Sequence, residues 1–205
     1  IVVINQIEYS KNRPIGYERN GLVQIPTMSE EFSGKSETMR NQFLASGAVT
    51  EMATTSSPTT AIWSNRGGYD WDGRQEGFQE DLAYTAVSYE FVEALGLEVA
   101  EGRGFSRDFP SDSNAVMLNE TAVKYMGIKN PVGKLIRHRN SNPDNPAPPM
   151  KIIGVIKDMI TQSPYEPVKQ GIYEFDRHNN ANFYNLRLNP EQSVAKSLEA
   201  IESIF

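Results

Sequence analysis

The sequence predicts an α+β fold with two lobes, an α/β lobe formed by both ends of the chain and an inserted, β-rich lobe that carries short helices. Helix-like and strand-like periodicities alternate near both ends, whereas the middle shows mostly short strand-like runs. A turn-rich segment at residues 55–60 lies where the two parts would meet. We therefore assign residues 1–60 and 177–205 to the α/β lobe and residues 61–176 to the insert.

The N-terminal part of the α/β lobe is predicted as a βαβ-like unit. Residues 21–26 form a strand that ends at a proline, residues 36–46 form a helix that ends at Gly47, and residues 49–52 are extended again. The helix face expected to be buried carries Met39, Phe43 and Leu44.

The C-terminal part supplies one strand and one helix to the same lobe. Tyr184, Leu186 and Leu188 alternate with polar residues, which predicts a strand. Asn189 followed by Pro190 predicts the start of a helix, because asparagine caps helices and proline fits the first helical position. The single apolar stripe expected on this helix consists of Val194, Leu198, Ile201 and Phe205.

The insert is predicted to contain two short helices among its strands. Ser88 is expected to cap a helix that Gly96 ends, and Asn119 to cap a second that Gly127 ends. Residues 140–149 are rich in proline and asparagine, which indicates an exposed loop. The predicted strands are residues 97–100, 115–118, 135–138, 151–156 and 172–175.

Composition and motifs argue against several classes of function. Twenty Lys and Arg against 26 Asp and Glu give a formal charge of −6 without a basic block, so we expect no nucleic acid partner. The chain has no cysteine, and no catalytic or nucleotide-binding motif is present; residues 102–104 (GRG) lack the third glycine of a dinucleotide site. Residues 112–114 and 144–145 lack the closing glutamate of a calcium loop and are interpreted as turns. We predict no catalytic, cofactor-binding or metal-binding residues and no enzyme activity.

An acidic, aromatic segment raises one alternative. Residues 70–81 are dense in carboxylates and lie close to Trp63, Tyr69 and Trp71, so a carbohydrate-binding or carbohydrate-cleaving domain that uses the Trp71 region is the alternative hypothesis. We favour an exposed loop whose aromatic side chains cover the edge of the core. An exposed, flat Trp71 beside Tyr69 would favour the carbohydrate hypothesis.

Both histidines are interpreted structurally. His138 lies between Arg137 and Arg139, and two cations disfavour a metal ion at that position. Strand alternation puts the two arginines on one face, expected to be solvated, and puts His138 with Ile136 on the other. His178 lies in a polar turn and is expected to be a loop residue.

Five segments in a fixed order carry a family resemblance that covers most of the chain. They are residues 12–17 (NRPIGY), 71–74 (WDGR), 102–105 (GRGF), 119–122 (NETA) and 154–158 (GVIKD). Together they resemble the extracytoplasmic domain of MacB/FtsX-type ABC transporter permeases, which is inserted after the first membrane helix of those proteins. The resemblance implies a MacB periplasmic core-like fold with a porter-like α/β lobe.

The same resemblance implies a function without chemistry. It implies a domain on the periplasmic side of the bacterial inner membrane that passes ATP-driven conformational change to export substrates or extracytoplasmic proteins. The implied partners are the flanking membrane helices, a cytoplasmic ATPase acting indirectly, a second permease copy, and a periplasmic adaptor, hydrolase or lipoprotein. We expect the chain to be a fragment; residues 1–4 (IVVI) are interpreted either as an edge strand or as the tail of a membrane helix.

Overall fold

The computed structural model describes residues 15–139, 147–163, 165–178 and 181–205. The predictions for residues 1–4 and for most of the loop at 140–149 lie outside these ranges. The helices are η1 (Glu30–Phe32), α2 (Ser36–Ala45), α3 (Phe91–Leu95), η2 (Pro110–Asn114), α4 (Glu120–Met126) and α5 (Val194–Glu202). The strands are β1 (Leu22–Pro26), β2 (Val49–Thr55), β3 (Asn65–Arg66), β4 (Tyr69–Trp71), β5 (Leu82–Val87), β6 (Val99–Gly102), β7 (Ala115–Asn119), β8 (Leu135–His138), β9 (Met150–Ile156), β10 (Gly171–Phe175) and β11 (Phe183–Leu188).

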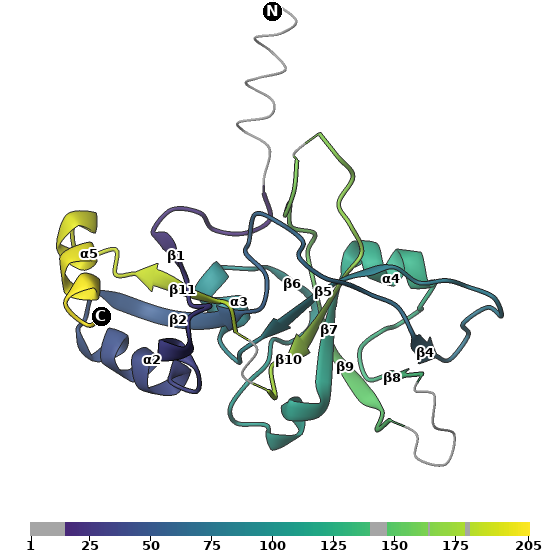
Figure 1. Ribbon diagram of the computed structural model, residues 1–205. Coiled ribbons are helices and arrows are strands. Elements are labelled where there is room, and N and C mark those ends of the chain that lie inside the picture. The colour runs from purple at the N-terminus through teal and green to yellow at the C-terminus, as the bar shows by residue number, and fades with distance from the viewer. Residues whose placement is uncertain (1–14, 140–146, 164, 179–180) are drawn as a thin grey trace, which may run out of the picture.

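Both ends of the chain build a three-stranded end of the molecule, which consists of β1, β11 and β2 with helices α2 and α5 (Figure 1). β11 lies between β1 and β2 and is antiparallel to both, so the predicted βαβ-like unit is split by the C-terminal strand. Their shared core consists of Met39, Phe43, Val49, Met52, Tyr184, Leu186, Leu188 and Ile201. This pattern agrees with an α/β lobe made from both ends, although the exact lobe boundaries stay a prediction.

The remaining strands close on themselves into what we call the strand ring. The sheet continues from β2 in the order β5, β10, β7, β9, β8 and β4. β3 pairs with β5, and only Gly67 and Gly68 separate β3 from β4, which pairs with β8. A Cβ on Gly67 would lie 2.7 Å from the Glu80 carbonyl oxygen, and Gly68 has a φ of +82°, so two glycines make this interruption sterically feasible.

The interior of the strand ring is apolar. Alternate residues of a strand point to one face, and each strand of the ring except the two-residue β3 contributes such residues to one buried cluster. The strand residues of this cluster are Tyr69, Trp71, Leu82, Tyr84, Ala86, Val116, Leu118, Ile136, Met150, Ile152 and Ile172. A second cluster packs α3 against the sheet through residues that include Phe91, Leu95, Met117, Ile153 and Tyr173.

All five strands predicted in the insert are present, one of them shifted, and three further strands were not predicted. β5 and the two-residue β3 are two of these, although the buried positions of β5 at Leu82, Tyr84 and Ala86 follow the period-two pattern of a strand. Residues 69–71, interpreted as loop, form β4. The strand expected at 97–100 is observed as Val99–Gly102, because the chain pairs with β9 only from Val99 onward.

Two predicted helix caps are wrong and one is confirmed. Asn119 caps α4 by accepting a hydrogen bond from the Ala122 N–H at 2.9 Å. Ser88 does not cap α3, because its hydroxyl accepts a bond from the Thr54 N–H and donates to Glu90, which occupies the cap position. The Ser88 hydroxyl is therefore bonded to β2 of the sheet, whereas the sequence predicted that it would cap α3.

Helix α5 starts later than predicted and buries less of its stripe. Its cap is Ser193, which accepts from the Lys196 N–H, while Asn189 stays bonded to the Gly47 carbonyl beside the sheet. Ile201 is 4% exposed, but Val194 is 59% and Leu198 43% exposed. In the part of the chain that the structure describes, no helix is both long and apolar enough to span a bilayer.

Candidate functional site

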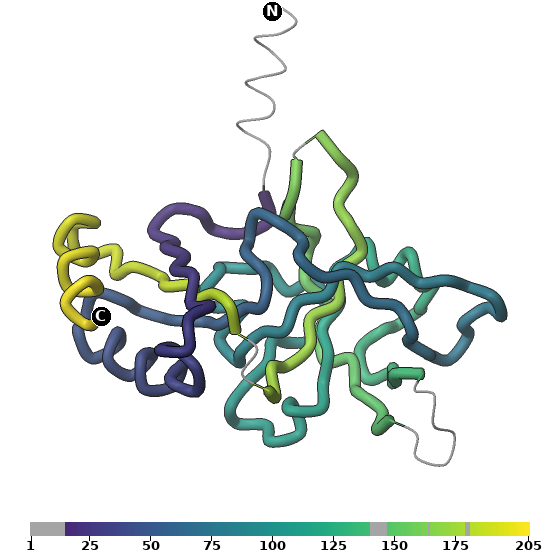
Figure 2. Tube along the Cα trace, in the orientation of Figure 1, coloured from purple at the N-terminus to yellow at the C-terminus, as the bar shows by residue number. Residues whose placement is uncertain are grey.

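The candidate functional site is the attachment of residues 15–21, called the lead-in segment, to the body of the protein. Figure 2 shows this dark purple segment crossing the top of the molecule before it turns into β1. Its first part is fixed next to the end of β9: the Ile160 N–H donates to the Ile15 carbonyl at 2.8 Å. A Cβ on Gly16 would lie 2.2 Å from the Asp158 carbonyl oxygen, so the two backbones are in direct contact.

The second part of the lead-in segment is fixed by Arg187 of β11. Its guanidinium donates to the Glu18 carbonyl at 2.8 Å, to the Asn20 carbonyl at 2.7 Å and to the Ala94 carbonyl in α3 at 2.9 Å. Burial lowers the pKa of Arg187, and nearby Glu18 opposes that shift. The guanidinium thus donates to three backbone carbonyls in two separate parts of the fold, the lead-in segment and α3.

Helix α3 makes a further contact with the same segment. The Glu18 N–H donates to the Leu95 carbonyl at 2.9 Å, and a Cβ on Gly96 would approach the Glu18 Cβ to 2.8 Å. Gly96 has a φ of +62° at the end of α3, as the predicted helix stop requires. We call residues 15–21 together with Arg187 and Gly96 the lead-in clamp.

Sequence reasoning did not find this clamp. Arg187 was expected only as one of the polar residues that alternate along a strand. Three carbonyl partners from distant parts of the chain leave no local pattern, and the NRPIGY segment gave the only signal, through Gly16.

The other segments that carry the resemblance have structural roles. A Cβ on Gly102 would lie 2.2 Å from the Ile153 carbonyl oxygen, and one on Gly154 would lie 2.2 Å from that of Arg103. β6 and β9 therefore cross at a distance that excludes any side chain. Between them, Arg103 makes a two-pronged ion pair with Asp112, which is fully buried and also accepts from the Ser106 N–H. Asp112 is thus a buried ion-pair partner rather than only a turn residue.

A second carboxylate, the partly buried Asp158, joins α4 to the end of β9. Asp158 accepts from the Thr121 N–H at 3.0 Å and from its hydroxyl at 2.6 Å. Asn119 accepts from the Gly171 N–H in addition to capping α4. The polar atoms of the NETA and GVIKD segments are therefore used inside the fold.

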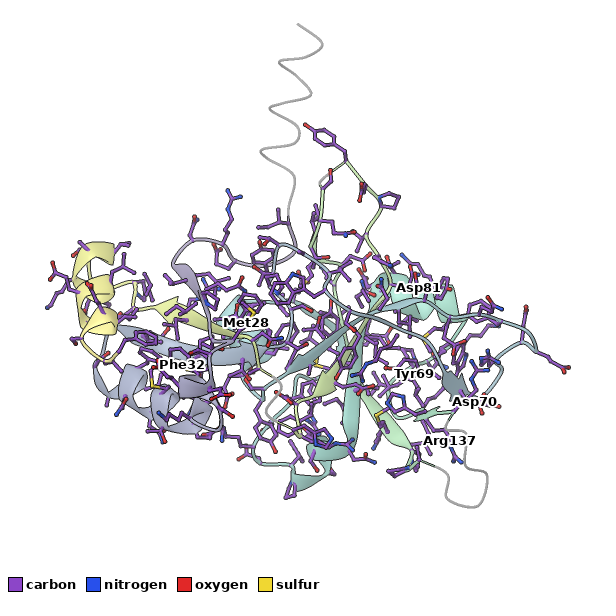
Figure 3. The ribbon with its side chains drawn as sticks, viewed as in Figure 1. Met28, Phe32, Tyr69, Asp70, Asp81 and Arg137 are labelled. Carbon is purple, nitrogen blue, oxygen red and sulfur yellow. The ribbon has the colours of Figure 1, made fainter. Side chains whose placement is uncertain are left out.

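The Trp71 region does not form an exposed sugar platform. Trp71 is 8% exposed and its indole N–H donates to the Met126 carbonyl at 3.2 Å, while Tyr69 is fully buried. Figure 3 shows Tyr69, Asp70 and Arg137 in the region of β4 and β8, at the opposite end of the molecule from Met28 and Phe32. The indole face of Trp71 is therefore too buried to stack on a sugar.

The acidic segment contains one carboxylate with a clear structural role, Glu80. Its side chain is 1% exposed and accepts from the Tyr69 N–H at 2.6 Å, from Arg74 at 3.0 Å and from Arg139 at 2.8 Å. Burial opposes its ionisation, but these hydrogen bonds outweigh burial and lower the pKa of Glu80 to about 2. Arg139 was expected to be a solvated strand residue; it is an ion-pair partner that anchors β8.

His138 faces the side of its strand that alternation predicts and contacts Glu174. Its Nε2 lies 3.2 Å from a Glu174 carboxylate oxygen, which also accepts from the Tyr69 hydroxyl at 2.8 Å. Burial raises the pKa of Glu174, and the bonds from His138 and Tyr69 together with the charge of Arg66 lower it by more. Glu174 and Arg66 were not singled out from the sequence.

Comparison with known proteins now identifies the family. The model of the MacB-like periplasmic core domain matches residues 4–204. This chain belongs to that family. No curated protein sequence matches the chain.

Two solved structures show the same fold as this MacB-like periplasmic core domain. The periplasmic region of MacB from Actinobacillus actinomycetemcomitans has a TM-score of 0.61 at 12% identity, covering 94% of this chain and 86% of that one. The extracellular domain of the noncanonic ABC-type transporter YknZ from Gram-positive bacteria has a TM-score of 0.56 at 14% identity, covering 87% and 88%. The α+β, MacB periplasmic core-like fold predicted from the sequence is confirmed.

Family membership also settles location and context. This MacB-like periplasmic core domain is part of an ABC transporter permease and lies on the periplasmic side of the membrane. The lead-in clamp contains residues 15–17, the described part of the NRPIGY segment that contributed to the family resemblance. Among the described residues, no three histidine or acidic side chains come together as a metal site would require.

Proposed function

We propose that this domain is a non-catalytic lever, which passes ATP-driven movement of its permease to export substrates or to extracytoplasmic partner proteins. The observation that supports this proposal best is the lead-in clamp. A lever needs its input segment fixed to the whole body, and residues 15–21 contact both parts of the structure. Membrane helices and an ATPase belong to the implied permease, and they would supply the movement.

The clamp gives a displacement of the lead-in segment two routes into the body. Through Ile15 and Gly16 it acts on the end of β9 in the strand ring. Through Arg187 it acts on β11 in the three-stranded end and on α3. Because close-packed interiors transmit strain with little compression, the two parts would move together.

An ion-pair bridge supports the same conclusion. Arg107 contacts Glu90 next to α3 at 2.5 Å and Glu37 in α2 at 2.6 Å. Burial lowers the pKa of Arg107, and the bonds to both glutamates raise it by more, so the net shift is upward. A partly exposed bridge contributes modestly, but it connects the same two parts as the clamp.

The outward end of the lever would act on partners that the family suggests. A second permease copy, a periplasmic adaptor, a peptidoglycan hydrolase and a lipoprotein are the candidates, with the export substrate itself as a further recipient. The exposed apolar residues of α5 are one described surface on which such a neighbour could rest, since Val194 is 59% and Leu198 43% exposed.

The test uses the complete permease with its ATPase in lipid nanodiscs. These 205 residues contain no cysteine, so in a permease whose other cysteines have been replaced, Arg19→Cys and Asp70→Cys place one spin label on the lead-in segment and one on the strand ring. We expect the distance between the labels to stay the same when ATP hydrolysis is trapped with vanadate, because the domain moves as one body. A shift of several ångströms between the two labels would contradict the lever.

Arg187→Met is the variant that tests the clamp. It should broaden the distance distribution and accelerate hydrogen exchange at residues 15–21, while Lys196→Met, an exposed cation of α5, should change neither. An unchanged distribution in Arg187→Met would count against the clamp. Hydrolysis or modification of a small molecule by the purified domain would overturn the non-catalytic part of the proposal.

A further inference from the structure

We propose that the mouth of the strand ring is a binding site for a carboxylate group. A hollow of about 300 Å³ opens there between the ends of β3, β5, β8 and β10. The mouths of small β-barrels are frequent positions for ligands, because side chains from several strands converge on one point. The polar residues that line the hollow are Arg66, Tyr84, His138, Glu174, Asp176, Arg177 and His178.

Glu174 fills the floor of the mouth and is already satisfied. It accepts from the Tyr69 hydroxyl, contacts His138 at 3.2 Å and lies 3.6 Å from Arg66. Its side chain is 12% exposed, so little of the carboxylate faces the hollow. The floor therefore fixes the orientation of its cationic neighbours and offers little acceptor capacity to a ligand.

Arg66 is the main donor left for a ligand. Its guanidinium carbon lies 3.3 Å from the centroid of the Tyr84 ring, so the group stacks flat on the aromatic face. A stacked guanidinium keeps its five N–H donors in one plane, and the Glu174 contact involves one edge of that plane. The side chain is 41% exposed at the rim, so part of the guanidinium is accessible to a ligand. This arrangement suits a planar acceptor such as a carboxylate.

Arg177 supplies a second fixed cation at the rim. It donates to the Ser113 carbonyl and, at 2.6 Å, to the Asn114 side-chain oxygen. These bonds hold the guanidinium in place beside the hollow and use two of its donors, so the remaining ones can meet a ligand. Arg66 and Arg177 come from β3 and from the end of β10, and the fold holds both at the same opening.

Charged groups of both signs meet at the mouth. The positive charges of Arg66 and Arg177 stand against the negative charges of Glu174 and Asp176. His138 contacts Glu174 and Tyr69, and His178 lies at the rim with Asp176 and Arg177. Recognition of a carboxylate at this site therefore depends on the placement of the arginine donors and not on an excess of positive charge.

The size of the hollow leaves two sources for the carboxylate. It can accept an acidic side chain of a partner polypeptide or a free small carboxylate. Both would meet the same donors. The two sources differ in one respect: in a polypeptide, the residues next to the acidic side chain can add affinity. Comparing a peptide with a free carboxylate therefore distinguishes them.

The test is a chemical-shift titration of the 205-residue chain over the millimolar range of three probes. The probes are a hexapeptide whose only charged group is a central glutamate, the same peptide with glutamine in its place, and sodium acetate. We expect saturable shifts at the mouth with the glutamate peptide and none with the glutamine peptide. Equal shifts with acetate would identify a free carboxylate as sufficient, and shifts with the peptide alone would identify a polypeptide ligand; either supports the proposal.

Two variants tie the binding to Arg66. Arg66→Gln should weaken the glutamate peptide by at least about tenfold, the usual effect of losing a hydrogen-bonded charge. Arg66→Lys, which keeps the charge and loses the fork, should lie between that variant and the wild type, and Arg19→Gln, an exposed cation elsewhere, should bind normally. Equal binding of the glutamine peptide, or unchanged binding in Arg66→Gln, would overturn the proposal.

Discussion

The strand ring and the three-stranded end hold their polar side chains in partly different ways. In and around the ring, carboxylates are paired with cations, as Glu80 is with Arg74 and Arg139. The three-stranded end has one such pair in Arg40 and Glu51, but its cation Arg187 is held by backbone carbonyls instead. An ion pair fixes two side chains to each other, whereas a cation on carbonyls fixes a side chain to the course of the chain. The ring is therefore suited to keep its shape, and the three-stranded end to hold the lead-in segment.

The two parts also differ at their borders. The ring returns to its own starting strand through β3 and β4, so few backbone groups are left at a free edge. At the other end, β1 pairs only with β11 among the described strands, and α5 exposes Val194 and Leu198. An open edge and an apolar helix face are the features expected where other parts of an assembly attach. The comparison thus assigns shape to the ring and attachment to the three-stranded end.

The strongest test of the claim that the ring keeps its shape is the close crossing of β6 and β9. Gly102 and Gly127 both have positive φ, +73° and +66°, but only a Cβ at Gly102 meets an atom, the Ile153 carbonyl oxygen at 2.2 Å. We expect Gly127→Ala to cost about 1 kcal/mol for its backbone conformation, and Gly102→Ala to cost about 4 kcal/mol or more. Urea unfolding measures both. Equal losses would mean that the close crossing does not hold this side of the fold together.

Acid titration of Glu80 also tests the claim that the ring keeps its shape. Its pKa is lowered from 4.5 to about 2 in the folded chain, so its stabilising contribution is complete above pH 4.5 and is lost as the pH falls toward 2. We expect Glu80→Gln to be less stable at pH 6 by about 1–3 kcal/mol, and to lose less further stability than the wild type between pH 4.5 and pH 2.5. Glu76→Gln, an exposed neighbour, should follow the wild type. Parallel curves for wild type and Glu80→Gln would contradict the ion-pair anchor.

Local patterns in the sequence were sufficient for most elements of both parts. Met39 and Phe43 are buried on α2 as their spacing predicts, and Asn119 caps α4 because both the cap residue and the Gly127 stop are local signals. Ser88 and Asn189 failed as caps since each has a stronger partner across the sheet. A hydroxyl or amide next to a helix start predicts a cap only when no strand competes for it.

The functional features depend on contacts that no local pattern contains. Glu174 lies 36 positions from His138 and 105 from Tyr69, and the three meet only because the ring closes. Arg187 meets Ala94 across 93 positions. The ordered segments of the resemblance predicted the fold correctly, since they mark steric requirements such as those at Gly102 and Gly154. The residues of the proposed carboxylate site, and Arg187 of the lead-in clamp, lie outside those segments, so finding them required the structure.

Helix α5 offers the finest test of the comparison, because one helix carries both a buried and an exposed apolar residue. Ile201 is 4% exposed in the core of the three-stranded end, and Leu198, three residues earlier, is 43% exposed. We expect Ile201→Ala to lower the free energy of unfolding by about 2–4 kcal/mol, and Leu198→Ala to lower it by no more than about 0.5 kcal/mol in the isolated chain. If α5 is an attachment surface, Leu198→Ser should weaken a neighbour's contact in the complete permease without changing the unfolding midpoint. A large loss in Leu198→Ala would instead place that residue in the core and remove the apolar helix face on which the attachment role of this end depends.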